Sequence, residues 1–311
     1  MNTLLLVVLV LVGLAVLLYL AFPAWLMDAG VRLARRRGGM REQRIRVGAI
    51  EWPYLEGGDP QGTPVVLIHG FGGDKDNWTY YAPFLTEHYR LITPDLPGFG
   101  ENDRSMGEDY SVTTQAARVR DFLDAIGVDR CHLGGNSMGG FIALQFALDY
   151  PERLLSLTLF NSAGVAGRDE SELEQMIAVD PGGNPLAVRT PADVGRLFTL
   201  VAYKPRWLPG RFKAVLFVRF KEHEKLLDQI FQQIISARHG GMLNDRLPQL
   251  AMPVQIIWGR HDRLIDVSCA LVLHENIPGS ELVIFEDVGH VPMIEKPGET
   301  ARHHLSFLDK Y

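Results

Sequence analysis

Gly135-Asn136-Ser137-Met138-Gly139-Gly140 is the stretch that decides the fold, and it lies between an apolar run at 131–134 and a helix-like segment at 141–150. A serine between small residues at a strand-to-helix turn is held on a strained backbone with its hydroxyl exposed, where a base on another loop can reach it. The pattern therefore predicts a nucleophilic Ser137. Ordinary glycine-rich turns share it, so its meaning depends on whether an oxyanion hole, an acid and a histidine occur elsewhere in the right order.

A second glycine-rich loop is a candidate oxyanion hole. The β-branched run at 65–68 predicts a buried strand that opens into His69-Gly70-Phe71-Gly72-Gly73. The backbone N–H of Phe71 in such a loop can face the same point as the N–H of Met138, and two such donors stabilise a tetrahedral oxyanion. We expect three loop residues to lie against the substrate, namely His69, Gly70 and Gly72. A hydrogen-bonding role within the loop is expected for His69.

The candidate acid and base follow the last two predicted strands. The apolar run at 253–258 is followed by Gly259-Arg260-His261-Asp262, and the run at 282–285 is followed by Glu286-Asp287-Val288-Gly289-His290. Each run ends in polar residues, as expected where a strand meets a loop. We therefore predict Asp262 as the acid and His290 as the base.

Other residues of the same types compete for both roles. Three further histidines lie near strand ends, namely His69, His132 and His261. His290 is preferred because it alone follows the final strand. The alternative acids are Asp266, Asp287 and Asp95. The loop Pro97-Gly98-Phe99-Gly100 after Asp95 is more typical of a structural turn than of a catalytic loop.

The chain order Ser137, Asp262, His290 is that of the α/β-hydrolase triad. From about Arg44 to the C-terminus the chain resembles α/β-hydrolase serine esterases and lipases, on the segments quoted above and on Asp95-Leu96-Pro97-Gly98-Phe99-Gly100. The resemblance implies an α/β-hydrolase fold, a mostly parallel eight-stranded sheet flanked by helices with a helical cap. It also implies an acyl-enzyme and no metal or organic cofactor. A nucleophilic serine argues against the dehalogenase and epoxide hydrolase members of the fold, which use a carboxylate.

The N-terminus is the second informative feature. Residues 4–22 are apolar except for Gly13 and Tyr19, and no charged side chain occurs before Asp28. About 20 apolar residues are needed to cross a bilayer as a helix, so we predict a transmembrane helix over 1–24. A cleaved signal peptide is the alternative. Such a peptide has a basic start and a small-residue cleavage site, whereas residues 1–3 carry no basic side chain and residues 22–25 offer a poor site.

The segment at 25–43 is rich in arginine. Trp25 suits a membrane interface, and the arginines that follow alternate with apolar residues as in an interfacial helix. A solvated linker is the alternative. The positive-inside rule places the catalytic domain in the cytoplasm.

Composition excludes one class of function. The 311 residues are 47% hydrophobic with a formal net charge of −6, so no strongly basic surface is available for nucleic acid. Cys131 and Cys269 fall in a predicted strand and a predicted helix, which indicates core residues and not a disulfide framework.

Alternating strands and helices divide the rest of the chain into three parts. The hydrolase core is expected over 44–164 and 251–311, and a helical cap over 165–250. An N-terminal hairpin is expected over 45–54 and a helix over 76–86. Within the cap, helices are predicted at 170–179, 192–203, 211–220 and 222–238. Most apolar cap residues are expected to pack onto the core and a few to line a substrate channel: Phe198, Leu200, Trp207, Leu208, Phe212, Leu216, Phe217 and Phe220.

An apolar cap over an esterase site beside a membrane helix indicates a substrate with an acyl chain. The Ser137 segment, the loop 69–75 and the single N-terminal helix resemble the membrane-anchored monoacylglycerol lipases and the PlaF-like phospholipase A group. This resemblance implies phospholipase A or lysophospholipase activity on membrane glycerolipids, and a homodimer. It also implies a bacterial cytoplasmic membrane with the catalytic domain on the face opposite to the cytoplasm, so the side of the catalytic domain is open. One alternative is a hydrolase of C–C bonds or of other small esters with the same fold. The other is a lipid-binding protein without catalytic activity.

Overall fold

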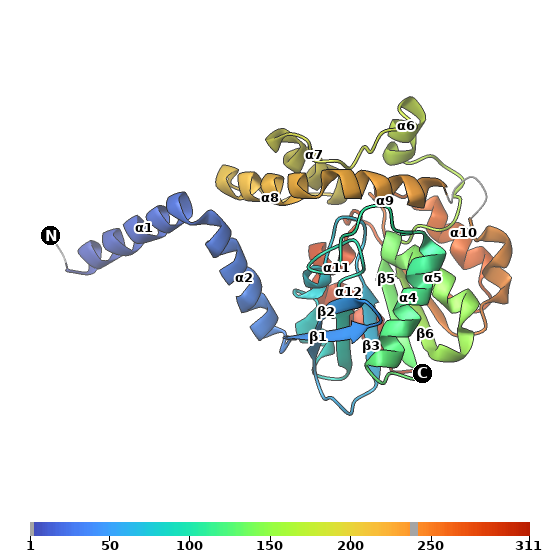
Figure 1. Cartoon of the computed structure of the whole chain (residues 1–311). Coiled ribbons are helices and arrows are strands. Elements are labelled where there is room, and N and C mark those ends of the chain that lie inside the picture. The colour runs from blue at the N-terminus through green and yellow to red at the C-terminus, as the bar shows by residue number, and fades with distance from the viewer. Residues whose placement is uncertain (1–2, 237–241) are drawn as a thin grey trace.

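The computed structural model describes residues 3–236 and 242–311. Its centre is an eight-stranded sheet with the order β1-β2-β4-β3-β5-β6-β7-β8 (Figure 1). The strands are β1 (Arg41–Val47), β2 (Ile50–Gly57), β3 (Pro64–Ile68), β4 (Arg90–Pro94), β5 (Cys131–Asn136), β6 (Leu154–Phe160), β7 (Val254–Gly259) and β8 (Glu281–Phe285). β2 pairs antiparallel with β1 and β4, and all other neighbours pair in parallel. The predicted mostly parallel eight-stranded sheet is confirmed.

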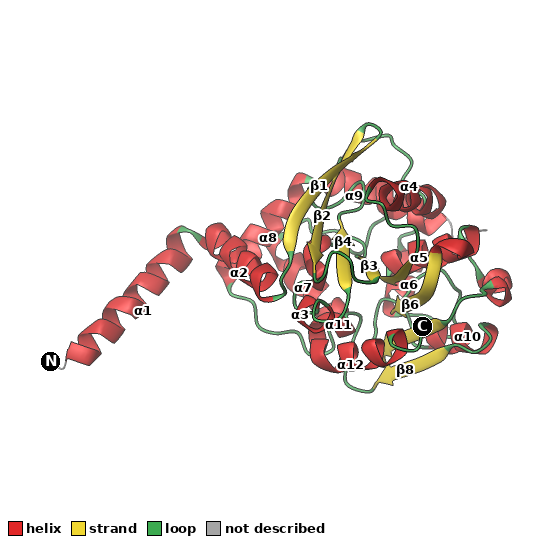
Figure 2. Cartoon of the chain, turned by 90° about the horizontal axis from the view of Figure 1, so that it is seen from below, coloured by secondary structure: helices red, strands yellow, loops and turns green. Residues whose placement is uncertain are grey.

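The central strands are buried on both faces, which explains why they read as continuous apolar runs. Val66 and Ile68 of β3 face one core, whereas Val65 and Leu67 face the other. The first core is closed by α4 (Val112–Ala125), α5 (Met138–Asp149) and α10 (Ser268–Asn276), and the second by α3 (Ala82–Leu85) and α12 (Pro297–Leu308). Figure 2 shows the sheet between these helices. Cys131 and Cys269 are buried free thiols, as predicted.

Two local predictions need correction. The N-terminal hairpin begins at Arg41, four residues before the predicted start at Ile45, and its second strand continues to Gly57. The single helix predicted over 76–86 is instead η1 (Lys75–Trp78) followed by the separate α3 (Ala82–Leu85). Pro83 explains the break, because proline has no N–H with which to continue a helix from the preceding turn.

Within the described residues, four α-helices lie between β6 and β7 in the chain. They are α6 (Glu172–Val179), α7 (Pro191–Val201), α8 (Gly210–Glu222) and α9 (Glu224–Ser236). Figure 1 shows them across one end of the sheet, with α8 and α9 almost in line. The last residues of the helix predicted over 222–238, and residues 237–241 of the expected cap, lie outside the described residues. Shorter helical segments complete the fold: η2 (Pro151–Arg153), η4 (Asn244–Gln249) and α11 (Pro292–Glu295).

The N-terminus forms α1 (Thr3–Ala21) and α2 (Pro23–Arg37), which meet at an angle (Figures 1 and 2). Among the described residues, α1 is the helix long and apolar enough to cross a membrane, and none of its residues is buried. α2 is held on the body. The Arg35 guanidinium donates to both carboxylate oxygens of Asp76, at 2.7 and 2.5 Å. The segment expected over 25–43 is therefore a docked helix and the start of β1, not a free linker.

Candidate active site

Ser137 occupies the turn between β5 and α5, in a backbone conformation that residues other than glycine rarely adopt. Its φ is 59° and its ψ is −121°. The turn is tight because a Cβ on Gly139 would lie 2.4 Å from the carbonyl oxygen of His69. Ser137 is half-buried, whereas the residues immediately before and after it are buried. The hydroxyl is thus presented at the end of a buried strand, as the sequence predicts.

Asp262 and His290 lie in hydrogen-bond contact although 28 residues separate them in the chain. The distance from His290 Nδ1 to Asp262 Oδ2 is 2.7 Å, and both side chains are almost fully buried. The other carboxylate oxygen accepts the N–H groups of Leu264, at 2.8 Å, and Ile265, at 3.0 Å. Because the carboxylate accepts the proton on Nδ1, neutral His290 keeps Nε2 free to act as a base.

Asn161, directly after β6, is a site residue that the sequence analysis missed. Its Nδ2 donates to Asp262 Oδ2 at 2.6 Å and to the carbonyl of Gly289 at 3.2 Å, and its Oδ1 accepts the N–H of Gly259 at 3.3 Å. Asn161 also has a positive φ of 43°. The sequence did offer a signal for this role. Asn161 follows a predicted strand at its carboxyl end, which is where functional residues of parallel sheets are found.

Two further side chains hold the loop that carries His290. Asn136 Nδ2 donates to the carbonyl of His290 at 3.0 Å, so the residue before Ser137 contacts the histidine directly. Glu295 accepts the N–H groups of Gly289, at 2.9 Å, and Val291, at 3.4 Å. Burial raises the pKa of the Glu295 carboxyl. Neither role was predicted.

The same loop is attached to the inserted helices. The N–H of His290 donates to the carbonyl of Val201, the last residue of α7, at 2.8 Å. Glu295 also accepts the N–H of Tyr203 at 2.9 Å, and the ring of Tyr203 stacks on His261 with 3.9 Å between centroids. His261 therefore packs beside the site. Among the described residues, its side chain forms no hydrogen bond with Asp262 or Ser137.

The loop after β3 passes directly over Ser137. A Cβ on Gly70 would lie 3.2 Å from the Cβ of Ser137. Within the residues that the structure describes, the N–H groups of Phe71 and Met138 donate no hydrogen bond to a protein acceptor. Two backbone donors beside the serine hydroxyl are thus available to an oxyanion.

His69 lies behind this loop and not against the cavity. It is fully buried, its Nδ1 donates to the carbonyl of Gly70 at 2.8 Å, and its Nε2 accepts the N–H of Leu96 at 3.1 Å. Burial lowers the pKa of His69. Of the three loop residues expected at the substrate, Gly70 and Gly72 line the cavity, and His69 supports the loop by hydrogen bonds.

The alternative acids are engaged elsewhere. Asp95 is fully buried and pairs with Lys75, whose Nζ lies 2.8 Å from Asp95 Oδ2. Asp266 caps the turn before α10 by accepting the N–H of Ser268 at 2.8 Å, and Asp287 pairs with Lys296. His132 lies inside the sheet and contacts Ser156 Oγ at 2.8 Å. Of the four candidate acids, Asp262 is the one in contact with His290.

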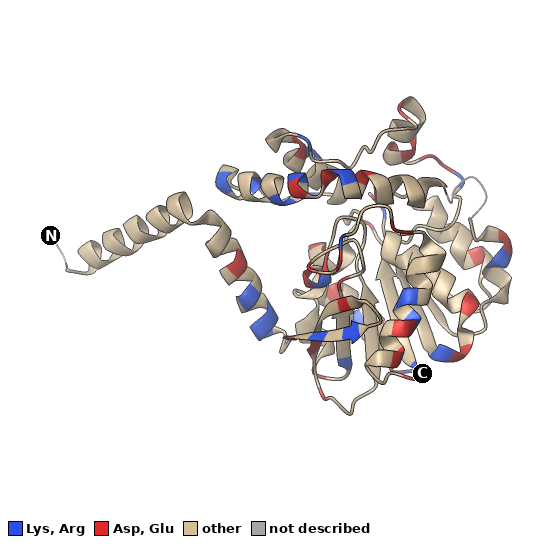
Figure 3. Cartoon of the chain, viewed as in Figure 1, with Lys and Arg blue, Asp and Glu red and all other residues tan. Residues whose placement is uncertain are grey.

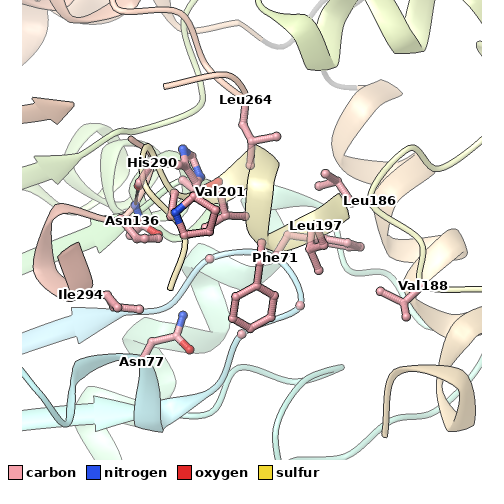
Figure 4. A pocket seen from close by; sticks show the side chains of 18 of the residues that line it. Phe71, Asn77, Asn136, Leu186, Val188, Leu197, Val201, Leu264, His290 and Ile294 are labelled. Atoms are coloured by element: carbon pink, nitrogen blue, oxygen red, sulfur yellow. Dashed lines mark hydrogen bonds between the residues drawn. The ribbon is translucent and has the colours of Figure 1, made fainter. Parts of the chain in front are cut away.

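Ser137 and His290 line the same cavity of about 510 Å³. Its wall is completed by α7, by the segment 202–208 and by apolar residues of the insertion. Figure 4 shows Leu197 beside Phe71, and His290 beside Asn136. Four of the apolar cap residues singled out from the sequence line it, namely Phe198, Trp207, Leu208 and Phe220. Other apolar residues of the insertion that line it were not singled out, among them Leu186, Val188, Leu197, Val201 and Leu227.

A second, smaller cavity of about 80 Å³ also reaches Ser137. Phe71 and Ser137 line both cavities, so the serine lies where the two approach each other. Apart from Ser137, the lining consists of apolar side chains and a glycine, including Phe141, Phe231 and Ile234. Among the described residues, no group of three His, Cys, Asp or Glu side chains is arranged to hold a metal ion.

Three comparisons place the chain among known proteins. Lipase 1 of Psychrobacter immobilis is 37% identical over 260 residues, which cover 82% of this chain and 79% of that protein. Monoacylglycerol lipase abhd6-A of Xenopus laevis is 30% identical over 302 residues, covering 93% and 88%. The crystal structure of a membrane phospholipase A, described as a bacterial virulence factor, is 40% identical with a TM-score of 0.88 and covers 100% of this chain and 99% of that one.

The family assignment rests on sequence and topology together. Residues 63–297 match the model of the alpha/beta hydrolase fold. The strand order and the positions of Ser137, Asp262 and His290 after β5, β7 and β8 agree with that match. The chain belongs to the alpha/beta-hydrolase fold family.

Proposed function

We propose that this protein is a membrane-anchored serine hydrolase that cleaves carboxylic esters of lipids, of the phospholipase A, lysophospholipase or monoacylglycerol lipase type. Ester hydrolysis is the activity common to the named lipases and the phospholipase to which it is similar. The observation that carries the proposal is the pairing of His290 with Asp262 at the wall of the cavity that Ser137 also lines.

In the proposed reaction Ser137 Oγ attacks the ester carbonyl carbon while His290 Nε2 accepts the hydroxyl proton. Asp262 stabilises the charged imidazole through Nδ1. The N–H groups of Phe71 and Met138 donate to the oxyanion of the tetrahedral intermediate. The alcohol then leaves with the proton from His290, and the acyl group stays on Ser137. A water molecule, deprotonated by His290, attacks the acyl carbonyl. The bond between the acyl carbon and Ser137 Oγ then breaks, His290 returns the proton to Oγ, and the carboxylic acid leaves.

The two cavities suit a substrate with an apolar and a polar part. The smaller cavity is apolar apart from Ser137 and suits an acyl chain, whereas the larger one carries charged residues at its rim. α1 supports membrane anchoring by its length and apolar surface. An anchor raises the local concentration of membrane lipids at the site. We propose the bacterial cytoplasmic membrane as the location, and protease accessibility of the catalytic part in spheroplasts tests which face it occupies.

The test is covalent labelling followed by substrate comparison. We expect a fluorophosphonate to label the wild type and not Ser137→Ala, and Ser137→Ala to lose at least about 10³-fold of ester turnover while unfolding at the same temperature. p-Nitrophenyl esters of graded chain length are offered beside a ring-fission dienone. A folded wild type that is not labelled at Ser137 would favour a lipid-binding protein, and preferred turnover of the dienone would favour a C–C hydrolase.

A homodimer, implied by the resemblance, is tested by sedimentation in detergent.

A further inference from the structure

The segment between α7 and α8 carries two cations at the rim of the larger cavity. Lys204 and Arg206 both line the cavity and are exposed, and Trp207 beside them is 82% exposed. Lys204 Nζ lies 5.0 Å from the centroid of the Tyr203 ring. Among the described residues neither cation has a carboxylate within ion-pair distance. The hydrogen bond and ion pair with Lys296 lower the pKa of Asp287, and Lys204 adds to this lowering without pairing with it.

The carboxylates that line the same cavity are already partnered. Glu224 pairs with Lys221 and with Arg189, the latter at 2.6 Å. Asp228 accepts from Arg189 at 3.2 Å and from Asn184 at 2.9 Å. Glu295 accepts three backbone N–H groups, as described above. Among the described residues, Lys204 and Arg206 are therefore the cations of this lining that have no carboxylate partner, and they attract an anion to the rim.

The start of α8, which follows the rim segment in the chain, contacts the end of α1. The N–H of Arg211 donates to the hydroxyl of Tyr19 at 3.2 Å, and the rings of Tyr19 and Phe212 meet edge to face with 5.4 Å between centroids. Farther along, Arg219 pairs with Asp28 of α2 at 2.6 Å. Figure 3 shows basic residues on α8 beside the junction of α1 and α2. Tyrosine near the end of a membrane helix marks the head-group level. The start of α8, four residues after Arg206, therefore lies near that level when α1 is inserted.

We propose that Lys204 and Arg206 form a phosphate-binding site that selects glycerophospholipids and lysophospholipids over uncharged acylglycerols. The proposal rests on the ester hydrolase function proposed above and names its preferred substrate class. Guanidinium and ammonium groups form charge-assisted hydrogen bonds with phosphate oxygens. An uncharged acylglycerol offers these cations no counter-ion. The ligand is the phosphate of a lipid and not a free phosphate, because the cations share their cavity with apolar side chains and with Ser137.

The test compares two lipids with the same acyl chain, lysophosphatidylglycerol and monoacylglycerol, in micelles of one neutral detergent. We expect Lys204→Gln/Arg206→Gln to lower kcat/KM for the lysophospholipid roughly tenfold and for monoacylglycerol less than about twofold. Arg36→Gln/Arg37→Gln removes two exposed cations of α2 that do not line the cavity and serves as the matched control. The control is expected to keep the wild-type ratio of the two substrates.

Three outcomes overturn the proposal. The first is an unchanged substrate ratio in Lys204→Gln/Arg206→Gln, and the second is an equal change in the control, which would indicate a general effect of surface charge. The third is inhibition of the wild type, but not of the variant, by glycerol 3-phosphate at the substrate concentration, which would assign the site to soluble phosphates. Turnover of p-nitrophenyl butyrate is measured in parallel. A wild type that cleaves no ester refutes the proposed function itself. Normal butyrate turnover in every variant shows that the catalytic residues are intact, so that any change in the substrate ratio is assigned to the head-group site.

Discussion

Asn161 Nδ2 lies 2.6 Å from Asp262 Oδ2, the same carboxylate oxygen that lies 2.7 Å from His290 Nδ1. The residue after β6 therefore holds the carboxylate that follows β7. An amide is a neutral donor, so it fixes the carboxylate without cancelling the negative charge that His290 requires when protonated. Asn161 is in this sense a positioning residue for the proposed triad.

We predict that Asn161→Ala lowers kcat for p-nitrophenyl butyrate roughly tenfold to hundredfold with little change in KM. The reason is that a carboxylate without this donor can rotate away from His290. Asn276→Ala, which removes an exposed amide on α10, is the control and should keep the wild-type rate. Thermal unfolding is recorded for both variants to exclude loss of folded protein. A kcat for Asn161→Ala within twofold of wild type, alongside an inactive Asp262→Ala, would contradict the positioning role.

The backbone at Ser137 predicts a stability difference between two inactive variants. With φ at 59° and ψ at −121°, the position is unfavourable for any residue with a Cβ and accessible to glycine. We expect Ser137→Gly to have a free energy of unfolding about 1 kcal/mol higher than Ser137→Ala, measured by urea titration. Both variants lack the hydroxyl, so their comparison isolates the backbone. Equal stability, or a more stable alanine variant, would show that the turn is not strained.

Buried histidines predict a loss of stability in acid. Burial lowers the pKa of His132 to about 4 and that of His304 to about 3, from a value of 6.5 in water. Between pH 6.5 and 4 the unfolded chain therefore binds more protons than the native chain at these positions. The free energy of unfolding consequently falls as the pH decreases through this range, by up to about 1.4 kcal/mol per pH unit for each histidine.

We predict that His304→Gln flattens this dependence by about 1 kcal/mol per pH unit relative to wild type. The measurement is urea unfolding at several pH values between 6.5 and 4.5. His88→Gln removes an exposed histidine and is expected to leave the slope unchanged. Identical slopes for wild type and His304→Gln would mean that His304 does not stay neutral in the native protein.

Removal of residues 1–22 tests the proposed anchor. We expect the shortened protein to cleave dispersed p-nitrophenyl butyrate at a rate within about twofold of wild type, because α1 lines neither cavity. Hydrolysis of phospholipid in vesicles should fall at least about tenfold, since the enzyme is no longer concentrated at the bilayer. Equal rates on vesicles with and without the segment would count against anchoring.

Much of the fold could be predicted from local sequence. The apolar runs at 65–68, 131–134 and 254–258 lie in strands of the central sheet, because strands buried on both faces are mostly apolar. The Ser137 turn was readable because close backbone contacts admit only small residues there. The helix predicted over 76–86 was wrong, since Pro83 interrupts it.

The sequence by itself determined which residue types follow each strand, and hence the candidates Ser137, Asp262 and His290. Only the tertiary structure decided which of them meet and what supports them. Asn161 contacts Asp262 across 101 residues of chain, and Asn136 contacts His290 across 154. Such contacts depend on strand order, which places the ends of β5, β6, β7 and β8 side by side. Local sequence indicates secondary-structure propensity and which residues are buried. Hydrogen bonds between loops that are distant in the chain form only once the parallel sheet has brought those loops together.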